Sequence, residues 1–221
     1  MTINSVQFDE TITKCQKCRR LVEFAAETKL KDRKKGFQIN DYWCKPVPSF
    51  GELDAHTLII GLAPGKHGAG RTGRPFTGDY AGEVLYKALY ESGLSNTEKA
   101  VSANDKLRLK GVRITNAVRC TPPKNKPLNE EILNCRPYLI QEIKMMKKLK
   151  FVMTLGSLAH KQLISCLELR QGDFKFAHNV VHELPKSDWK LINSYHPSRY
   201  NINTKRLTYR MFLEVIQKLA H

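Results

Sequence analysis

Short runs of apolar residues recur along the chain, and each is followed by a segment with helical periodicity. The apolar runs are residues 56–62, 112–118, 151–155 and 190–194, and the helical patterns are residues 80–92, 129–149, 157–167 and 205–219. Continuous apolar runs of this length are typical of strands that are buried on both faces of a parallel sheet. Because strand and helix alternate four times, the sequence predicts an α/β fold with helices on both faces of a parallel sheet.

Four other segments complete the predicted organisation. Residues 15–31 have a helical stripe of apolar positions, and residues 32–56 are rich in turn formers and predict a long surface connection. Residues 174–184 predict a short antiparallel pair. Pro137 predicts a break or offset in the helix at 129–149, because proline removes a backbone donor and its ring clashes with the preceding turn.

Three of the predicted strands run into loops of unusual composition. These are GLAPGKHGAGRTGRPFTGD at 61–79, TNAVRCTPP at 115–123 and SYHPSRYN at 194–201. In open α/β sheets, ligands bind beyond the carboxyl ends of the strands. We therefore expect the three loops to meet at one edge of the sheet and to form the functional site there.

The amino-acid composition indicates what kind of partner the protein binds. The 221 residues include 37 Lys and Arg against 21 Asp and Glu, a formal net charge of +16. The length predicts a single domain that covers residues 1–221, and no apolar stretch approaches the roughly 18–20 residues that a bilayer span needs. We expect a cytoplasmic, monomeric protein whose partner is nucleic acid rather than a membrane.

The cysteines suggest a metal site. Cys15 and Cys18 form a C-x₂-C pair, and Cys120 and Cys135 lie downstream, separated from each other. Four thiolates can hold either a tetrahedral zinc ion or a [4Fe–4S] cluster, and burial without any metal is the alternative. A structural zinc site usually has two close pairs, so the single pair here favours the larger cluster. Cys44 and Cys166 are isolated, and the sequence assigns them no role.

The three loops and the four cysteines together resemble the uracil-DNA glycosylase superfamily. The long first loop and the HPSR motif at 196–199 are similar to its family-5, or type-b, branch. The resemblance implies a three-layer α/β/α sandwich around a four-stranded parallel sheet, and a [4Fe–4S] cluster on Cys15, Cys18, Cys120 and Cys135. It also implies an enzyme that excises uracil and other deaminated bases from DNA. Such an enzyme flips the base out of the duplex and leaves an abasic site.

Three residues are the candidates for catalysis. Asn116 offers a donor and an acceptor to the edge of a base, and His196 can donate a hydrogen bond to a base carbonyl as negative charge develops. Leu62 stands where other branches carry a polar residue that activates water, so we assign that role to Asp79, the nearest carboxylate. Asp79 also stands where it would cap the helix that follows.

Further residues are assigned to binding. The substrate-binding candidates are Gly61, Ala63, His67, Phe76 and Asn116, with Phe76 as the aromatic face on which a base stacks. The DNA-binding candidates are Lys66, Arg71, Arg74, Ser198 and Arg199. Cationic side chains supply affinity for phosphates without sequence preference. The main alternative is a non-catalytic nucleic-acid-binding protein with a structural four-cysteine metal site.

Overall fold

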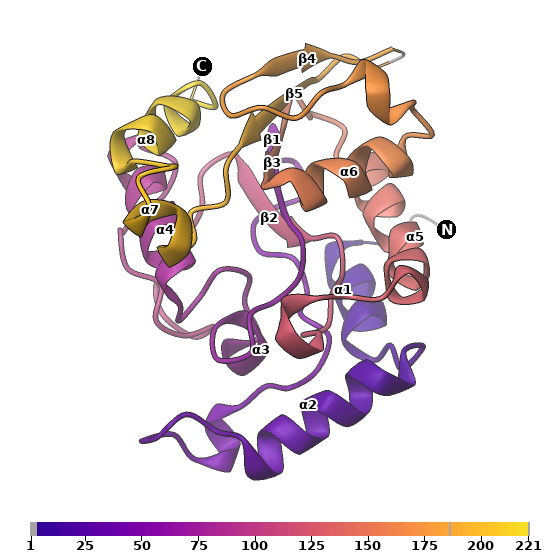
Figure 1. Ribbon diagram of the computed structural model, residues 1–221, viewed down its shortest axis with the longest axis vertical. Coiled ribbons are helices and arrows are strands. Elements are labelled where there is room, and N and C mark those ends of the chain that lie inside the picture. The colour runs from indigo at the N-terminus through magenta and orange to yellow at the C-terminus, as the bar shows by residue number, and fades with distance from the viewer. Residues whose placement is uncertain (1–3, 186, 221) are drawn as a thin grey trace.

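A five-stranded sheet forms the middle layer of the computed structural model, which describes residues 4–185 and 187–220 (Figure 1). The strands are β1 (Thr57–Gly61), β2 (Val112–Asn116), β3 (Phe151–Leu155), β4 (Val181–Glu183) and β5 (Lys190–Ser194). Their order is β2-β1-β3-β5-β4; the first four are parallel and β4 pairs antiparallel with β5. The four predicted parallel strands are confirmed, and the strand count is corrected from four to five. β4 lies within residues 174–184, where the sequence predicts a short antiparallel pair, but it pairs with β5 at the edge of the sheet and not within that segment.

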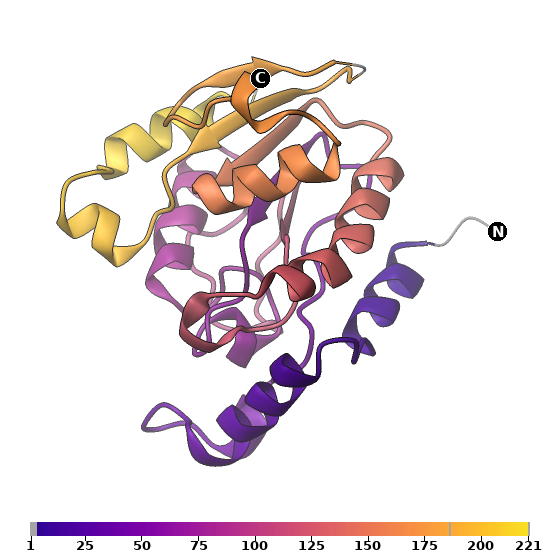
Figure 2. The same cartoon turned by 45° about the vertical axis from the view of Figure 1, so that its right-hand side comes forward.

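Helices cover both faces of the sheet, as Figures 1 and 2 show. The long ones are α4 (Tyr80–Glu91), α5 (Asn129–Met145), α6 (Ser157–Cys166) and α8 (Tyr209–Gln217). Since neighbouring strand residues point to opposite faces, Ile59 and Met153 pack in one core cluster with α4 and α8. Leu58 and Val152 pack in the other cluster with α5 and α6. Among the described residues, no helix is both long and apolar enough to cross a bilayer.

The N-terminal segment forms two helices beside this sandwich. They are α1 (Ser5–Thr13) and α2 (Arg19–Lys31), and the views agree that α2 lies at the end of the molecule remote from β4. The sequence did not predict α1, which a reciprocal capping box between Asn4 and Gln7 begins. The helix predicted from residue 15 starts only at Arg19, which leaves Cys15 and Cys18 in the connection between the two helices.

The structure contains short helices that the sequence did not predict, and the effect of one proline differs from the prediction. The short elements are α3 (Ala69–Thr72), α7 (Arg199–Asn203), η1 (Ile39–Asp41), η2 (Pro123–Asn125) and η3 (Gln171–Asp173). Pro137 lies inside α5 without ending it, because the residue is exposed and water can reach the carbonyl that loses its partner. The C-terminal helix begins at Tyr209 rather than at residue 205.

A buried ionic network joins β2, α5 and the segment before β1. Glu142 of α5 accepts hydrogen bonds from Arg113 Nε and from Arg119 Nη2, both at 2.6 Å. Arg119 Nη1 also donates to Ser49 Oγ at 2.7 Å, and Arg113 Nη2 lies 3.3 Å from Asp9 Oδ1. Burial alone would raise the pKa of Glu142, but the two guanidinium groups lower it to about 2. The carboxylate is therefore charged throughout the physiological range.

We predict that Glu142→Gln lowers the free energy of unfolding by about 3–5 kcal/mol, because it leaves two buried guanidinium groups without their counter-charge. Glu130→Gln, at an exposed position of the same helix, should cost less than about 1 kcal/mol. Urea denaturation followed by circular dichroism measures both. Equal losses in the two variants would show that the network contributes nothing beyond an ordinary surface charge.

Candidate active site

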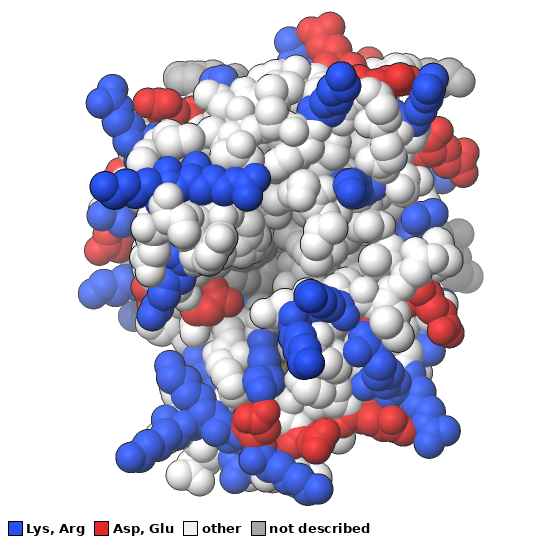
Figure 3. Space-filling model, in the orientation of Figure 1, with Lys and Arg blue, Asp and Glu red and all other residues white. Residues whose placement is uncertain are grey.

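The carboxyl ends of β1, β2, β3 and β5 border a cavity of about 490 Å³. Its lining includes Leu62, Ala63, Pro64, Gly65, Ala69, Phe76, Asp79, Ala81, Asn116, Asn125, Leu155, Gly156, Ser157, Leu158, Phe176, Tyr195, His196, Ser198, Asn201 and Arg206. The face seen in Figure 1 is hollowed near its middle, with Lys and Arg side chains around the hollow (Figure 3). The three loops that the sequence singles out all contribute to this one cavity.

Asn116 is the last residue of β2 and lies opposite Gly61 in the parallel register. A Cβ on Gly61 would lie 2.4 Å from Asn116 Oδ1 and 2.7 Å from Phe76 Cζ, so only glycine lets both side chains approach β1. The side chain of Asn116 is 3% exposed and makes no hydrogen bond to another described residue. Its amide is therefore free to bind a ligand in the cavity.

Phe76 adopts a left-handed backbone conformation, with φ of 51°. This is unusual for an aromatic residue and costs roughly 1–3 kcal/mol, so the surroundings must enforce it. Next to it, Tyr86 Oη donates to the Pro75 carbonyl at 2.8 Å, and Arg74 forms two 2.7 Å hydrogen bonds to Asp105. The ring centroid of Phe76 lies 6.0 Å from that of His196. The turn thus holds an aromatic face against the catalytic candidate.

His196 lies two residues beyond β5 and lines the cavity. Its carbonyl accepts hydrogen bonds from Ser198 N and from Asn201 Nδ2, both at 2.8 Å, which fix the backbone of the loop. Burial lowers the pKa of His196 to about 4. At neutral pH the ring is uncharged, and no described side chain accepts a hydrogen bond from its N–H. The ring can therefore serve as a neutral hydrogen-bond donor.

Asp79 is both a helix cap and a cavity residue. Its Oδ1 accepts from Gly82 N at 2.9 Å at the start of α4, which confirms the predicted capping. A Cβ on Gly68 would lie 2.1 Å from Asp79 Oδ2, so the first loop closes tightly over the second carboxylate oxygen. Burial raises the pKa of Asp79, and the hydrogen bond from Gly82 opposes that shift. One carboxylate oxygen of Asp79 therefore caps α4, and the residue also lines the cavity.

The basic candidates of the first loop are less free than the sequence suggests. Lys66 pairs with Asp32, and Arg71 donates to the His67 carbonyl at 3.0 Å while stacking on the Phe37 ring. Arg74 is only 4% exposed and both its terminal nitrogens bind Asp105. The expectation that Arg74 contacts DNA is therefore corrected, because a fully paired, buried guanidinium holds the turn and cannot reach a phosphate.

The remaining candidates divide between cavity and surroundings. Ser198 lines the cavity and caps α7, while Arg199 is exposed with its guanidinium carbon 5.0 Å from the centre of the Tyr80 ring. Ala63 lines the cavity. His67 does not, since its Nδ1 bonds to Tyr42 Oη at 2.7 Å. The structure therefore places the His67 ring against Tyr42, in the connection between α2 and β1, rather than in the cavity.

Several cavity residues were missed from sequence. Phe176 comes from the irregular segment before β4, and Arg206 stacks on Tyr195 with its guanidinium carbon 4.7 Å from the ring centre. Tyr195 adjoins His196, so its proximity in the chain is a signal that could have found it. Phe176 and Arg206 carry no such signal, because only the tertiary fold brings their segments to this edge.

Cys15, Cys18, Cys120 and Cys135 all line one small cavity between α1, α2 and α5. Among the described residues, no three His, Cys, Asp or Glu side chains converge closely enough to hold a single metal ion. Burial raises the pKa of the thiols of Cys120 and Cys135, so an electropositive partner is needed to keep them as thiolates. Four thiols spread around one pocket suit a multinuclear cluster better than one ion.

Two polar side chains beside these thiols also suit a multinuclear cluster. Asn134 Nδ2 lies 3.6 Å from Cys18 Sγ as a hydrogen-bond donor. Arg119 also lines the four-cysteine cavity, and its Nε is buried with no acceptor among the described residues. An unpartnered donor beside four thiols is what a site built for additional sulfur acceptors would contain.

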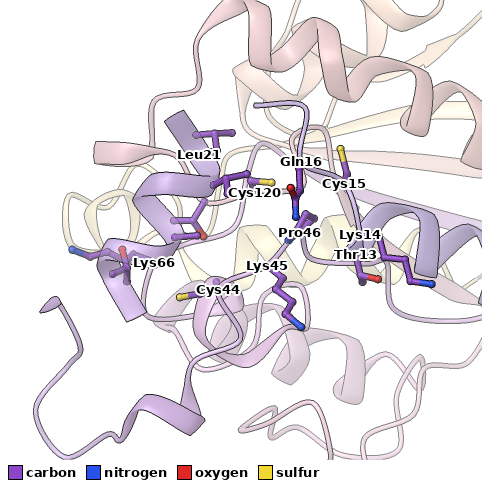
Figure 4. Close-up of a pocket in the computed structure, with 15 residues that line it drawn as sticks. Thr13, Lys14, Cys15, Gln16, Leu21, Cys44, Lys45, Pro46, Lys66 and Cys120 are labelled. Carbon is purple, nitrogen blue, oxygen red and sulfur yellow. The ribbon is translucent and has the colours of Figure 1, made fainter. Parts of the chain in front are cut away.

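A second cavity of about 330 Å³ adjoins the cysteines (Figure 4). Cys15, Cys44 and Cys120 are all among its lining residues, and Figure 4 shows them. Cys166 is buried in the core between α5 and α6, away from this group. The two cysteines without a sequence-based role thus have different surroundings: Cys44 lines the same cavity as Cys15 and Cys120, and Cys166 lies in the hydrophobic core.

Comparisons with known proteins agree with this geometry. A model described as the uracil DNA glycosylase superfamily matches residues 48–220. The chain is 44% identical to the type-5 uracil-DNA glycosylase of Thermus thermophilus, over 96% of this chain and 94% of that protein. It is 38% identical to the type-5 protein of Pyrobaculum aerophilum over 96% and 91%, respectively. It is 36% identical to a type-4 uracil-DNA glycosylase of the same organism, over 62% of this chain and 64% of that protein.

We predict that the His196 ring titrates near pH 4, because burial lowers its pKa to about 4 from an ordinary 6.5. The unfolded chain then binds more protons than the fold between these two values, so the free energy of unfolding falls as pH drops through this window. NMR titration of the ring proton, assigned by its loss in His196→Gln, measures the midpoint. A midpoint near 6.5 would show that the ring is solvated and would remove the argument for a neutral donor.

Proposed function

The chain belongs to the uracil DNA glycosylase superfamily, and to its type-5 group, and on this premise we propose that it hydrolyses the bond between uracil and deoxyribose in DNA. The observation that carries the proposal is the meeting of Asn116, His196 and Asp79 around one cavity at the carboxyl edge of the sheet. These three groups come from three different loops. Together they provide recognition of the base, support for the leaving group and support for the sugar.

The target base must first leave the duplex. Extrusion costs a few kcal/mol, and less for a mismatched base such as uracil opposite guanine. Inside the cavity, the ring of Phe76 offers a face for stacking. Tyr200 lies on α7 between two cavity residues and is 72% exposed, so it is placed to fill the gap that the flipped base leaves in the stack.

Base recognition and leaving-group support come from Asn116 and His196. The Asn116 amide can pair with the edge of uracil, which presents one N–H beside a carbonyl oxygen. As the bond to the sugar breaks, negative charge grows on the base, and the neutral His196 ring donates to a base carbonyl. A preorganised donor of this kind commonly contributes about 3–4 kcal/mol in the transition state. Other deaminated bases also present carbonyl groups, so we extend the proposal to them.

Asp79 supports the opposite end of the breaking bond. Positive charge develops on the sugar, and the half-buried carboxylate stabilises it and orients the attacking water. Leu62, which also lines the cavity, cannot serve this purpose. Because burial raises the pKa of Asp79 and the ionised form is required, excision slows as pH falls through that pKa.

The product of this reaction is an abasic site. Strand cleavage by a glycosylase requires an amine that forms a Schiff base with the sugar. Among the described residues that line the cavity there is no lysine. We therefore propose that the enzyme is monofunctional and leaves the DNA backbone intact.

Contacts to the DNA backbone come from the rim of the cavity. Arg199 is exposed beside Ser198, and the net charge of +16 attracts phosphates over the whole surface. Lys66 and Arg71 remain candidates, provided that a phosphate replaces the surface partners that they have in the free protein. Contacts of this kind are independent of sequence, as a search for rare uracils requires.

We further propose that Cys15, Cys18, Cys120 and Cys135 hold a [4Fe–4S] cluster. The shared cavity, the four-thiol donor set and the unpartnered Arg119 Nε support this assignment. When bound, the cluster would link the α1–α2 connection to β2 and α5 through four covalent bonds to iron. Since Cys120 lies four residues after Asn116, its anchoring holds the loop that carries the recognition residue.

We predict that Asp79→Asn lowers the single-turnover rate of uracil excision by roughly 10²–10⁴-fold. Asparagine caps a helix about as well as aspartate, so the fold should be retained. Glu83→Gln is the matched control, because Glu83 is an exposed carboxylate in the first turn of the same helix and does not line the cavity. The assay uses duplex DNA with one uracil and detects abasic sites by alkaline cleavage.

A near-normal rate for Asp79→Asn would refute the role of this carboxylate. DNA binding without any excision by the unmodified protein would refute the catalytic proposal itself and favour a non-catalytic binding protein. Strand breaks that appear without alkali or heat would refute the monofunctional reaction.

We predict that Cys135→Ser abolishes most of the iron and acid-labile sulfide and the brown colour of the purified protein, because the alkoxide of serine is a poor replacement for a thiolate ligand. Cys166→Ser should retain both, since Cys166 is similarly buried but does not line the four-cysteine cavity. Iron and sulfide analysis of anaerobically purified protein measures the difference. Zinc in place of iron in the unmodified protein would overturn the choice of metal.

A further inference from the structure

Arg119 has one hydrogen-bond donor that the fold leaves unused. The residue directly precedes Cys120 and is 2% exposed. Its two terminal nitrogens bind Ser49 Oγ at 2.7 Å and Glu142 Oε2 at 2.6 Å, whereas Nε has no partner among the described residues. A buried donor without an acceptor destabilises the fold, so its retention calls for an explanation.

The position of Arg119 supplies one. Arg119 lines the same small cavity as the four cysteines. Glu142 and Ser49 fix the guanidinium from its far end, so the side chain cannot turn to find another acceptor. Glu142 also accepts a hydrogen bond from Arg113, a residue that does not line the four-cysteine cavity.

We propose that Arg119 Nε donates a hydrogen bond to a sulfur atom of the bound cluster, a role that rests on the cofactor proposed above. Arg119 is thus a positioning residue for the cluster, and its hydrogen bonds to Glu142 and Ser49 hold it in that role. Cys135 is 5% exposed, so water has little access to the inner side of the cavity and a protein donor replaces it there.

This arrangement has an electrostatic consequence. A cluster ligated by four thiolates is anionic, and reduction by one electron makes it more so. A hydrogen bond and a buried cation stabilise the more negative state, and therefore raise the reduction potential. The same contact opposes loss of the cluster to solvent.

A pair of matched substitutions tests the proposal. Arg119→Lys and Arg113→Lys make the same chemical change in two buried residues that share Glu142, but only Arg119 lines the cysteine cavity. We expect Arg119→Lys to shift the midpoint potential of the cluster to a more negative value. Loss of the visible absorbance in the presence of a chelator should become roughly 10-fold faster. Arg113→Lys should leave both properties as in the unmodified protein, although both variants lose thermal stability.

A spectroscopic measurement on the unmodified sequence keeps the test decisive if Arg119→Lys does not fold. In protein with ¹⁵N at the Nε of every arginine, reduced with dithionite, pulsed EPR should detect a coupling between the cluster spin and one nitrogen. Absence of any such coupling would overturn the proposal, as would a coupling that persists in a folded Arg119→Lys variant.

The outcomes separate this inference from the cofactor proposal. Unmodified protein that contains no iron refutes the cluster, and this inference falls with it. A cluster that is present in the unmodified protein and unchanged in potential and retention in Arg119→Lys refutes the inference alone. Equal shifts in the Arg119→Lys and Arg113→Lys variants would show that general disturbance of the network, and not the donor, sets the properties of the cluster.

Discussion

Four strands of the sheet run in the same direction, and this parallel alignment determines where the functional loops lie. Because β1, β2, β3 and β5 run in the same direction, their carboxyl ends reach one edge, and the loops that follow them must share one space. Gly61 in β1 then lets Asn116 and Phe76 approach closely from neighbouring segments. The resulting cavity is walled by backbone that the sheet holds rigidly, so its polar groups are positioned before a ligand arrives. Such preorganisation is where most electrostatic catalysis originates.

The sequence predicted the scaffold well because the buried strands carry a strong local signal. The bounds of β3 and β5 agree with the apolar runs at 151–155 and 190–194. The edge strand β4 and the helix α1 carry weaker patterns, since one is exposed and the other is defined mainly by its cap. Convergence of three loops was predictable from topology alone, and it placed Asn116, Asp79 and His196 together correctly.

Side-chain pairing was not predictable in the same way. Arg74 was predicted to contact DNA because it lies in a glycine-rich loop. Its guanidinium instead pairs with Asp105, which is 31 residues away in the chain. His67 likewise bonds to Tyr42, a residue of the connection between α2 and β1, for which the sequence pattern predicts no regular secondary structure. Phe176 and Arg206 enter the cavity from segments with no distinctive residues around them. In each case the deciding contact is long-range, and one sequence alone does not contain it.

The buried ion network lies beside a short stretch of chain that leads from the cavity to the four cysteines. Arg113 lies in β2, which ends at Asn116, and Arg119 lies between Asn116 and the proposed cluster ligand Cys120. This stretch therefore carries the proposed base-recognition residue, a buried cation and a proposed metal ligand. Arg113 and Arg119 both bind Glu142 in α5, the same helix that carries Cys135. Through Arg119 and Glu142, the chain between the cavity and the four cysteines is joined to α5.

An extruded uracil is expected to occupy the cavity between Asn116 and His196. The crystal structure of the Asp79→Asn variant with duplex DNA that contains a single uracil tests this placement. We expect the uracil ring against Phe76, with its edge bonded to the Asn116 amide and a carbonyl oxygen facing the His196 ring. A uracil that remains stacked in the duplex, or one bound elsewhere on the protein, would show that base recognition does not occur in this cavity.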